Sequence, residues 1–252
     1  MISERDLARG FHGLWGEALP LLNAHMVHLF NGAYREQVVD HDVGRLGSAI
    51  ATQSDTDSAV VAEFAFHLAR LAHEQEVGSE DLGNEAALLA EAEANALLLI
   101  GEYEGGKTEP RVSLKESERS EGLLLLKNYD VLLSNYARDE IEFCPRIPGC
   151  GFVKGCTADL SLGDCLFEVK TVSRNIAGKD IRQLFVYLAL QSGTGEERWS
   201  EGGFFNPRRG LLYQFSLDRV IPMMSGGQLK AEVFGRMLDF FAQRDIQLDT
   251  EF

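Results

Sequence analysis

The sequence predicts an α/β protein in which a mixed sheet flanked by helices follows an all-helical amino-terminal region. In the first hundred residues, apolar side chains recur every three or four positions, which is the period of a buried helix face. The second half contains several short strand-like runs separated by helical segments. The chain has 252 residues, of which 45% are hydrophobic and 25% are charged, and these values are typical of a globular protein.

The amino-terminal region is rich in Ala, Leu and Glu. Ser54 and Asp55 are expected to cap a helix that runs through Leu71, and Ser79 is expected to cap another through Leu99. Glycines and a proline between residues 101 and 110 then interrupt the helical period. We therefore expect a helical region at residues 1–110, without an assignable role, and a second domain at residues 111–252.

The second domain is expected to alternate between helices and strands. Helices are predicted near residues 114–136, 179–191 and 229–244, and strands near 141–144, 152–160, 165–172 and 210–215. This order favours an α/β core with a mixed sheet.

Charge is distributed unevenly along the chain. The net charge is −15, but residues 144–219 hold ten Lys/Arg against eight Asp/Glu, a net of +2, so the remainder carries −17. The near-neutral segment could bind a phosphodiester locally, and the acidic helical region could dock a protein partner. The absence of a long apolar run predicts no transmembrane helix or signal peptide, and cytoplasmic residence is the default expectation.

The most informative stretch is ADLSLGDCLFEVKT, residues 158–171, which reads as a β-hairpin turning at Leu162–Gly163. Pairing Leu160 with Cys165 would place Asp159 opposite Leu166. Directly paired residues share a face, and side chains alternate along a strand. One face then carries the three polar residues Asp159, Glu168 and Lys170. The other face carries Ala158, Leu160, Cys165, Phe167 and Val169.

The residue types on the polar face indicate metal chemistry. Two carboxylates a few ångströms apart repel each other unless a cation neutralises them, and hard oxygen ligands suit Mg²⁺ or Mn²⁺. Such a metal can polarise a phosphoryl oxygen and orient water. A lysine beside it can stabilise negative charge on a phosphate. The alternative to a metal site is an ordinary β-hairpin whose charged residues face solvent.

The pattern Asp159-x8-Glu168-Val169-Lys170 resembles the motif of the PD-(D/E)XK nuclease superfamily, although Thr157 and Ala158 stand where the name has proline. In the helix that follows, Gln183 and Tyr187 resemble the Q-x-x-x-Y motif of its RecB- and Cas4-like branch. The resemblance spans residues 118–215 and implies a restriction-endonuclease-like core.

The resemblance also implies roles for individual residues. Asp159, Glu168 and the Val169 carbonyl would hold the metal, and Lys170 would position water. Gln183 and Tyr187 would steady the site. The superfamily places a further glutamate on an upstream helix, and Glu121 fits that role best by its helical position, with Glu118 and Glu142 as alternatives.

The leading hypothesis is therefore a Mg²⁺- or Mn²⁺-dependent nuclease acting on DNA, in defence or repair. Five basic residues could contact phosphates or could be ordinary solvated charges: Arg174, Lys179, Arg182, Arg208 and Arg209. One alternative is a non-catalytic subunit that keeps the nuclease-like core and docks a partner through its acidic helices. A weaker one is nucleotide binding at Gly101–Thr108, which matches the P-loop spacing.

Overall fold

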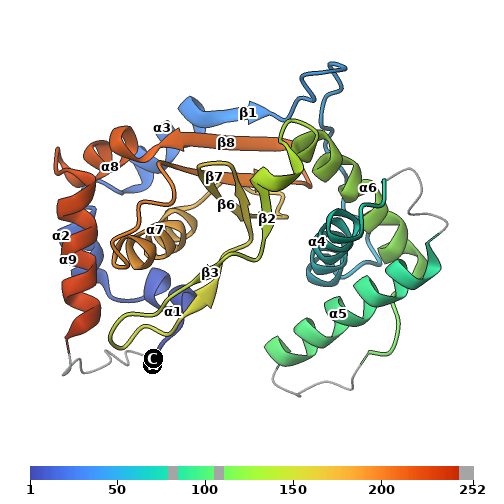
Figure 1. Cartoon of the computed structure of the whole chain (residues 1–252), viewed down its shortest axis with the longest axis horizontal. Coiled ribbons are helices and arrows are strands. Elements are labelled where there is room, and N and C mark those ends of the chain that lie inside the picture. The colour runs from blue at the N-terminus through green and yellow to red at the C-terminus, as the bar shows by residue number, and fades with distance from the viewer. Residues whose placement is uncertain (79–84, 105–110, 244–252) are drawn as a thin grey trace.

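A mixed six-stranded sheet lies between two layers of helices in the computed structural model, which describes residues 1–78, 85–104 and 111–243 (Figure 1). The strand order is β1-β8-β7-β6-β5-β2, and β6 and β7 are the parallel pair. The strands are β1 (Arg35–Gln37), β2 (Ile141–Phe143), β5 (Leu160–Leu162), β6 (Cys165–Val169), β7 (Glu201–Asn206) and β8 (Leu211–Ser216).

Six helices belong to the layer that contains α7. They are α1 (Glu4–Arg9), α2 (His12–Ala18), α3 (Ala24–Tyr34), α7 (Gly178–Ser192), α8 (Leu217–Ser225) and α9 (Lys230–Ala242). Leu7, Trp15 and Phe30 from the first three helices share one apolar core with Leu184 of α7 and Phe204 of β7. The amino-terminal helices are therefore built into the packing of the sheet.

The opposite layer consists of α4 (Ser58–Gln75), α5 (Ala86–Glu104) and α6 (Glu116–Leu133). Phe64 of α4 and Leu125 of α6 share a second core with Phe167 and Phe205 of the sheet. Asp57 caps α4 by accepting hydrogen bonds from the backbone N–H groups of Ala59 and Val60. The cap is thus two residues beyond the predicted Ser54–Asp55, and the predicted cap Ser79 lies outside the described residues.

The predicted division at residue 110 does not coincide with a division in packing. β1 pairs antiparallel with β8 at the edge of the sheet, α1 packs on α7, and α4 packs on α6. Segments on both sides of residue 110 thus contribute to both apolar cores.

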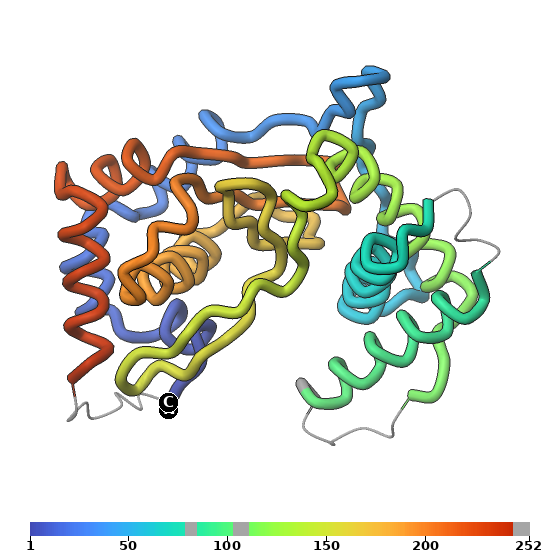
Figure 2. The backbone as a smooth tube through the Cα atoms, in the orientation of Figure 1, coloured from blue at the N-terminus to red at the C-terminus, as the bar shows by residue number. Residues whose placement is uncertain are grey.

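A two-stranded arm, β3 (Arg146–Ile147) with β4 (Cys156–Thr157), extends from the sheet and runs beside α1 (Figure 2). Ile2 forms a parallel bridge with Val153 in this arm, and the backbone N–H of Lys154 donates to the Ile2 carbonyl at 3.1 Å. These contacts tie the start of the chain to the arm.

The elements differ from the predicted ones at several places. The expected strand 152–160 is split into β4 and β5, while β1, β3, β7 and the short α8 were not predicted. Gly101 lies in the last turn of α5 rather than in a loop after a strand, and the rest of the P-loop pattern from residue 105 onward lies outside the described residues. Among the helices that the structure describes, none is long and apolar enough to cross a membrane.

Candidate metal centre

The hairpin of β5 and β6 brings the two predicted acidic ligands together. Its observed register pairs Leu162 with Cys165 and Leu160 with Phe167, so the turn is Gly163–Asp164, one residue beyond the predicted position. Gly163 has φ +55°, which favours glycine in a tight turn. If this register continues one residue beyond Leu160, Asp159 lies opposite Glu168. The sequence had predicted Leu166 as its partner. The backbone N–H of Val169 donates to Asp159 Oδ2 at 2.7 Å, which fixes that carboxylate.

The faces of the hairpin agree with the alternation predicted from the sequence, with one exception. Leu160, Cys165, Phe167 and Val169 pack in the core beneath α4 and α6. Ala158 instead joins the core on the α7 side, because it precedes β5 and belongs to the link from the arm.

Lys170 connects the hairpin to α7. Its Nζ lies 2.6 Å from Glu168 Oε1 and donates to Gln183 Oε1 at 3.1 Å. Gln183 Nε2 in turn donates to the Tyr187 hydroxyl at 2.9 Å. Gln183 and Tyr187 lie one helical turn apart on α7 and are both buried, so they form a rigid support for the lysine.

Burial and the negative charge of Glu168 raise the pKa of Asp159 to about 8, although Lys170 and the Val169 N–H act in the opposite direction. Burial acts to lower the pKa of Lys170, but the charges of Glu168 and Asp159 outweigh it and raise that pKa above its usual value. Lys170 therefore stays protonated, and this cation faces the Glu168 carboxylate and the Asp159 carboxyl group in a buried site.

The metal-free protein should lose stability as pH rises. Folding raises the pKa of Asp159, so the folded chain holds a proton that the unfolded chain releases between pH 3.8 and about 8. This contribution is complete below pH 3.8 and is lost as pH rises through about 8, at up to about 1.4 kcal/mol per pH unit. Urea unfolding in chelator across this window should show a steeper loss for the wild type than for Asp159→Asn; parallel curves would contradict the assignment.

The donor atoms present fit a divalent cation. Glu168 is 1% exposed, and its Oε2 is buried without a hydrogen-bond partner among the described residues. An anionic oxygen in that position is unfavourable unless a cation neutralises it. Asp159 and Glu168 supply carboxylate oxygens, which Mg²⁺ and Mn²⁺ prefer. Within the described ranges, however, no cluster of three or more His, Cys, Asp or Glu side chains could hold a metal, so the remaining ligands would be carbonyls or water.

Glu121, the first choice for the upstream glutamate, is engaged elsewhere. Its Oε1 pairs with Arg208 Nη2 at 2.7 Å, and its Oε2 accepts from the Gln53 backbone and the Thr56 hydroxyl. The two alternatives also have partners: Glu118 is ion-paired with Arg111, and Glu142 is ion-paired with Arg198 at the surface. The apolar stripe of this helix correctly indicated that Glu121 is buried. It could not indicate the ion pair with Arg208, because Arg208 is far away in the sequence.

Glu63 on α4 is a further acidic residue that sequence reasoning did not consider. Its negative charge raises the pKa of both Asp159 and Tyr129, although burial is the larger cause for each. Burial raises the pKa of Glu63 itself, while Arg5 lowers it. One turn later, burial lowers the pKa of His67 to about 4, and neither ring nitrogen has a described partner. The available signal was a glutamate and a histidine within an otherwise apolar helical run, AVVAEFAFHLA.

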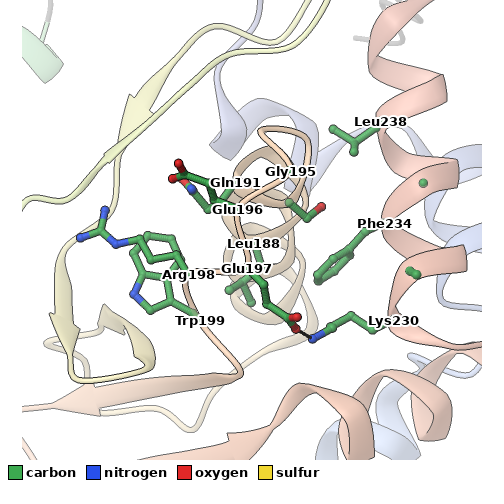
Figure 3. Close-up of a pocket in the computed structure, with 13 residues that line it drawn as sticks. Leu188, Gln191, Gly195, Glu196, Glu197, Arg198, Trp199, Lys230, Phe234 and Leu238 are labelled. Carbon is green, nitrogen blue, oxygen red and sulfur yellow. Dashed lines mark hydrogen bonds and ion pairs between the residues drawn. The ribbon is translucent and has the colours of Figure 1, made fainter.

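A cavity in the described part of the chain lies away from these residues. It has a volume of about 310 Å³ at the carboxyl end of α7, with Leu188, Trp199 and Phe234 in its wall (Figure 3). Lys230 reaches Glu197 across its rim. None of Asp159, Glu168 and Lys170 lines it, so this cavity is separate from the carboxylate pair.

Comparisons of the chain with protein-family models, with curated proteins and with solved structures found no match. Its function must therefore be inferred from the chemistry of its own side chains.

Proposed function

We propose that this protein is a metal-dependent nuclease of the PD-(D/E)XK type, with a restriction-endonuclease-like core, which hydrolyses phosphodiester bonds of DNA. The observation that carries the proposal is the arrangement of Asp159, which directly precedes β5, beside Glu168 of β6, with Lys170 held between Glu168 and Gln183. A role in defence or repair would follow from the superfamily resemblance alone.

In this proposal Asp159, Glu168 and the Val169 carbonyl would hold Mg²⁺ or Mn²⁺, which would polarise the phosphate as a Lewis acid. Glu121 is given no role at the metal, because its charge is matched by Arg208.

Lys170 places a fixed positive charge beside the reacting phosphate. Its ammonium group would orient the attacking water and stabilise the developing negative charge. Gln183 holds Nζ in position through its amide oxygen, and Tyr187 fixes the orientation of that amide. Gln183 and Tyr187 are thus positioning residues, which act through the lysine.

Purified protein should cut DNA in the presence of Mg²⁺ or Mn²⁺, and EDTA should stop cleavage. Asp159→Asn removes one ligand charge while keeping the side-chain volume, so it should abolish cleavage. Plasmid and linear single- and double-stranded DNA should be tested in parallel, with RNA as a further arm. Cleavage that survives EDTA or is equal in Asp159→Asn would refute the proposal.

A second candidate function is a binding subunit that keeps this core without catalysis. Residues 85–104 hold five glutamates and no Lys or Arg, so most of α5 would suit a basic protein partner. A wild-type protein that neither cuts nucleic acid nor takes up Mn²⁺ would favour this function.

A further inference from the structure

The cationic side chains on and around α7 are mostly paired within the protein. Arg174 holds Asp180 through two hydrogen bonds of 2.5 and 3.0 Å. Arg208 is buried against Glu121, and Arg209 donates to the Asn175 amide oxygen at 2.6 Å. The guanidinium groups of these arginines are bound to other side chains of the protein, so they are poor candidates for substrate contacts.

Arg182 on α7 differs from them. Its guanidinium lies over the ring of Trp15, 5.6 Å from the ring centroid. The Trp15 ring is itself fixed, because it is 2% exposed and its Nε1 donates to the Leu7 carbonyl at 2.9 Å. No carboxylate within the described residues forms an ion pair with Arg182, which is the difference from Arg174 and Arg208. Its Nε is buried without a hydrogen-bond partner, as is the Nε of Arg208.

A partly buried cation without an anion is unfavourable for folding. Burial lowers the pKa of Arg182, and no neighbouring negative charge counters this effect. The contact with Trp15 offsets part of the cost, and it also holds the planar guanidinium in one orientation. A fixed guanidinium with unused donors matches the geometry of a phosphate group, which it can bind through two parallel hydrogen bonds.

Arg182 immediately precedes Gln183, the residue of α7 that contacts Lys170. Successive helix residues project about 100° apart, so the Arg182 side chain points away from the carboxylate pair and lies on Trp15, on the same turn of α7 as Gln183. That placement suits a phosphate neighbouring the one that is cut.

We propose that Arg182, held on Trp15, is the binding subsite for a backbone phosphate of the nucleic-acid strand next to the scissile phosphate. The inference rests on the proposed nuclease function and adds a sequence-independent contact that sets the register of the strand.

The test measures binding of a labelled DNA oligonucleotide by fluorescence anisotropy at several salt concentrations, with Ca²⁺ in place of Mg²⁺. Arg182→Met removes the charge but keeps an apolar side chain on Trp15, and Arg182→Lys keeps the charge. Arg219→Met is the matched control, because Arg219 is exposed on α8 and its pairing is not part of the site. Circular dichroism and thermal unfolding establish that each variant is folded.

Arg182→Met should weaken binding roughly fivefold near 0.1 M salt and reduce the slope of log K against log salt by about 0.7, the loss of one phosphate contact on a single strand. Arg182→Lys should retain most of the slope, and Arg219→Met should behave as the wild type. If wild-type protein cuts DNA but Arg182→Met and Arg219→Met bind it equally, the subsite is wrong and the nuclease function stands. If the wild type neither binds nor cuts DNA, the proposed function fails and the subsite fails with it.

Discussion

Replacement of Lys170 by methionine should lower the rate of DNA cleavage by about 10²- to 10³-fold, the usual effect of removing one group that stabilises charge in the transition state. Methionine keeps most of the side-chain volume but cannot donate to Glu168 or Gln183, so both the ammonium charge and its fixed position are lost. Single-turnover cleavage with Mg²⁺ measures the effect directly.

Mn²⁺ binding separates this result from simple loss of the fold. Lys170 is a cation beside two carboxylates, so its removal should leave Mn²⁺ affinity unchanged or increase it. Lys127→Met is the matched control, because Lys127 is exposed on α6, on the opposite layer of helices. Equal cleavage by Lys170→Met and Lys127→Met would remove the lysine from the proposed chemistry.

Replacement of Arg208 by methionine should cost about 3 kcal/mol or more of the free energy of unfolding, because it leaves Glu121 as a buried carboxylate without its cation. Arg208 is 3% exposed, and Glu121 is fully buried. The same carboxylate holds the segment before α4 through Gln53 and Thr56, so that segment should loosen as well. Urea unfolding measures the change.

Two further variants test this account of the ion pair. The double variant Arg208→Met with Glu121→Gln should recover part of the stability, since the uncompensated charge is then gone. Arg209→Met, one residue away and only partly buried, should change stability by roughly 0.5 kcal/mol or less. A loss below about 1 kcal/mol in Arg208→Met would contradict the account, as would a loss of Mn²⁺ binding in Glu121→Gln alone.

The long helices could be predicted because each carries a regular apolar stripe. The stripes expected at 114–136, 179–191 and 229–244 correspond to α6, α7 and α9. The hairpin was also recognisable, since turn residues separate two alternating runs. Its register was predicted two pairs away from the observed one, because the sequence does not show that Gly163 and Asp164 alone form the turn.

The central strand β7 escaped prediction for a physical reason. Two glycines, Gly202 and Gly203, hide its period, because glycine is usually unfavourable within a strand. At Gly203 a Cβ atom would lie 2.3 Å from the Phe167 ring, so the glycine is required by packing across β6 and β7. Only the assembled sheet reveals that requirement.

The polar residues around the site show a similar limit. The spacing of residues along one hairpin and one helix was enough to predict a set of neighbouring polar side chains. The set consists of Asp159, Glu168, Lys170, Gln183 and Tyr187. The spacing could not show that Glu121, Glu118 and Glu142 each form an ion pair with an arginine, because those pairs form only in the folded chain. Contacts between distant segments, such as Glu121 with Arg208, are set by the packing of layers.

Calorimetric titration of Mn²⁺ into wild-type protein and Asp159→Asn tests most directly whether the facing carboxylates form a metal centre. A saturable heat of binding in the wild type that disappears in Asp159→Asn is the predicted result. No uptake by the wild type, or equal uptake by the two proteins, would contradict it.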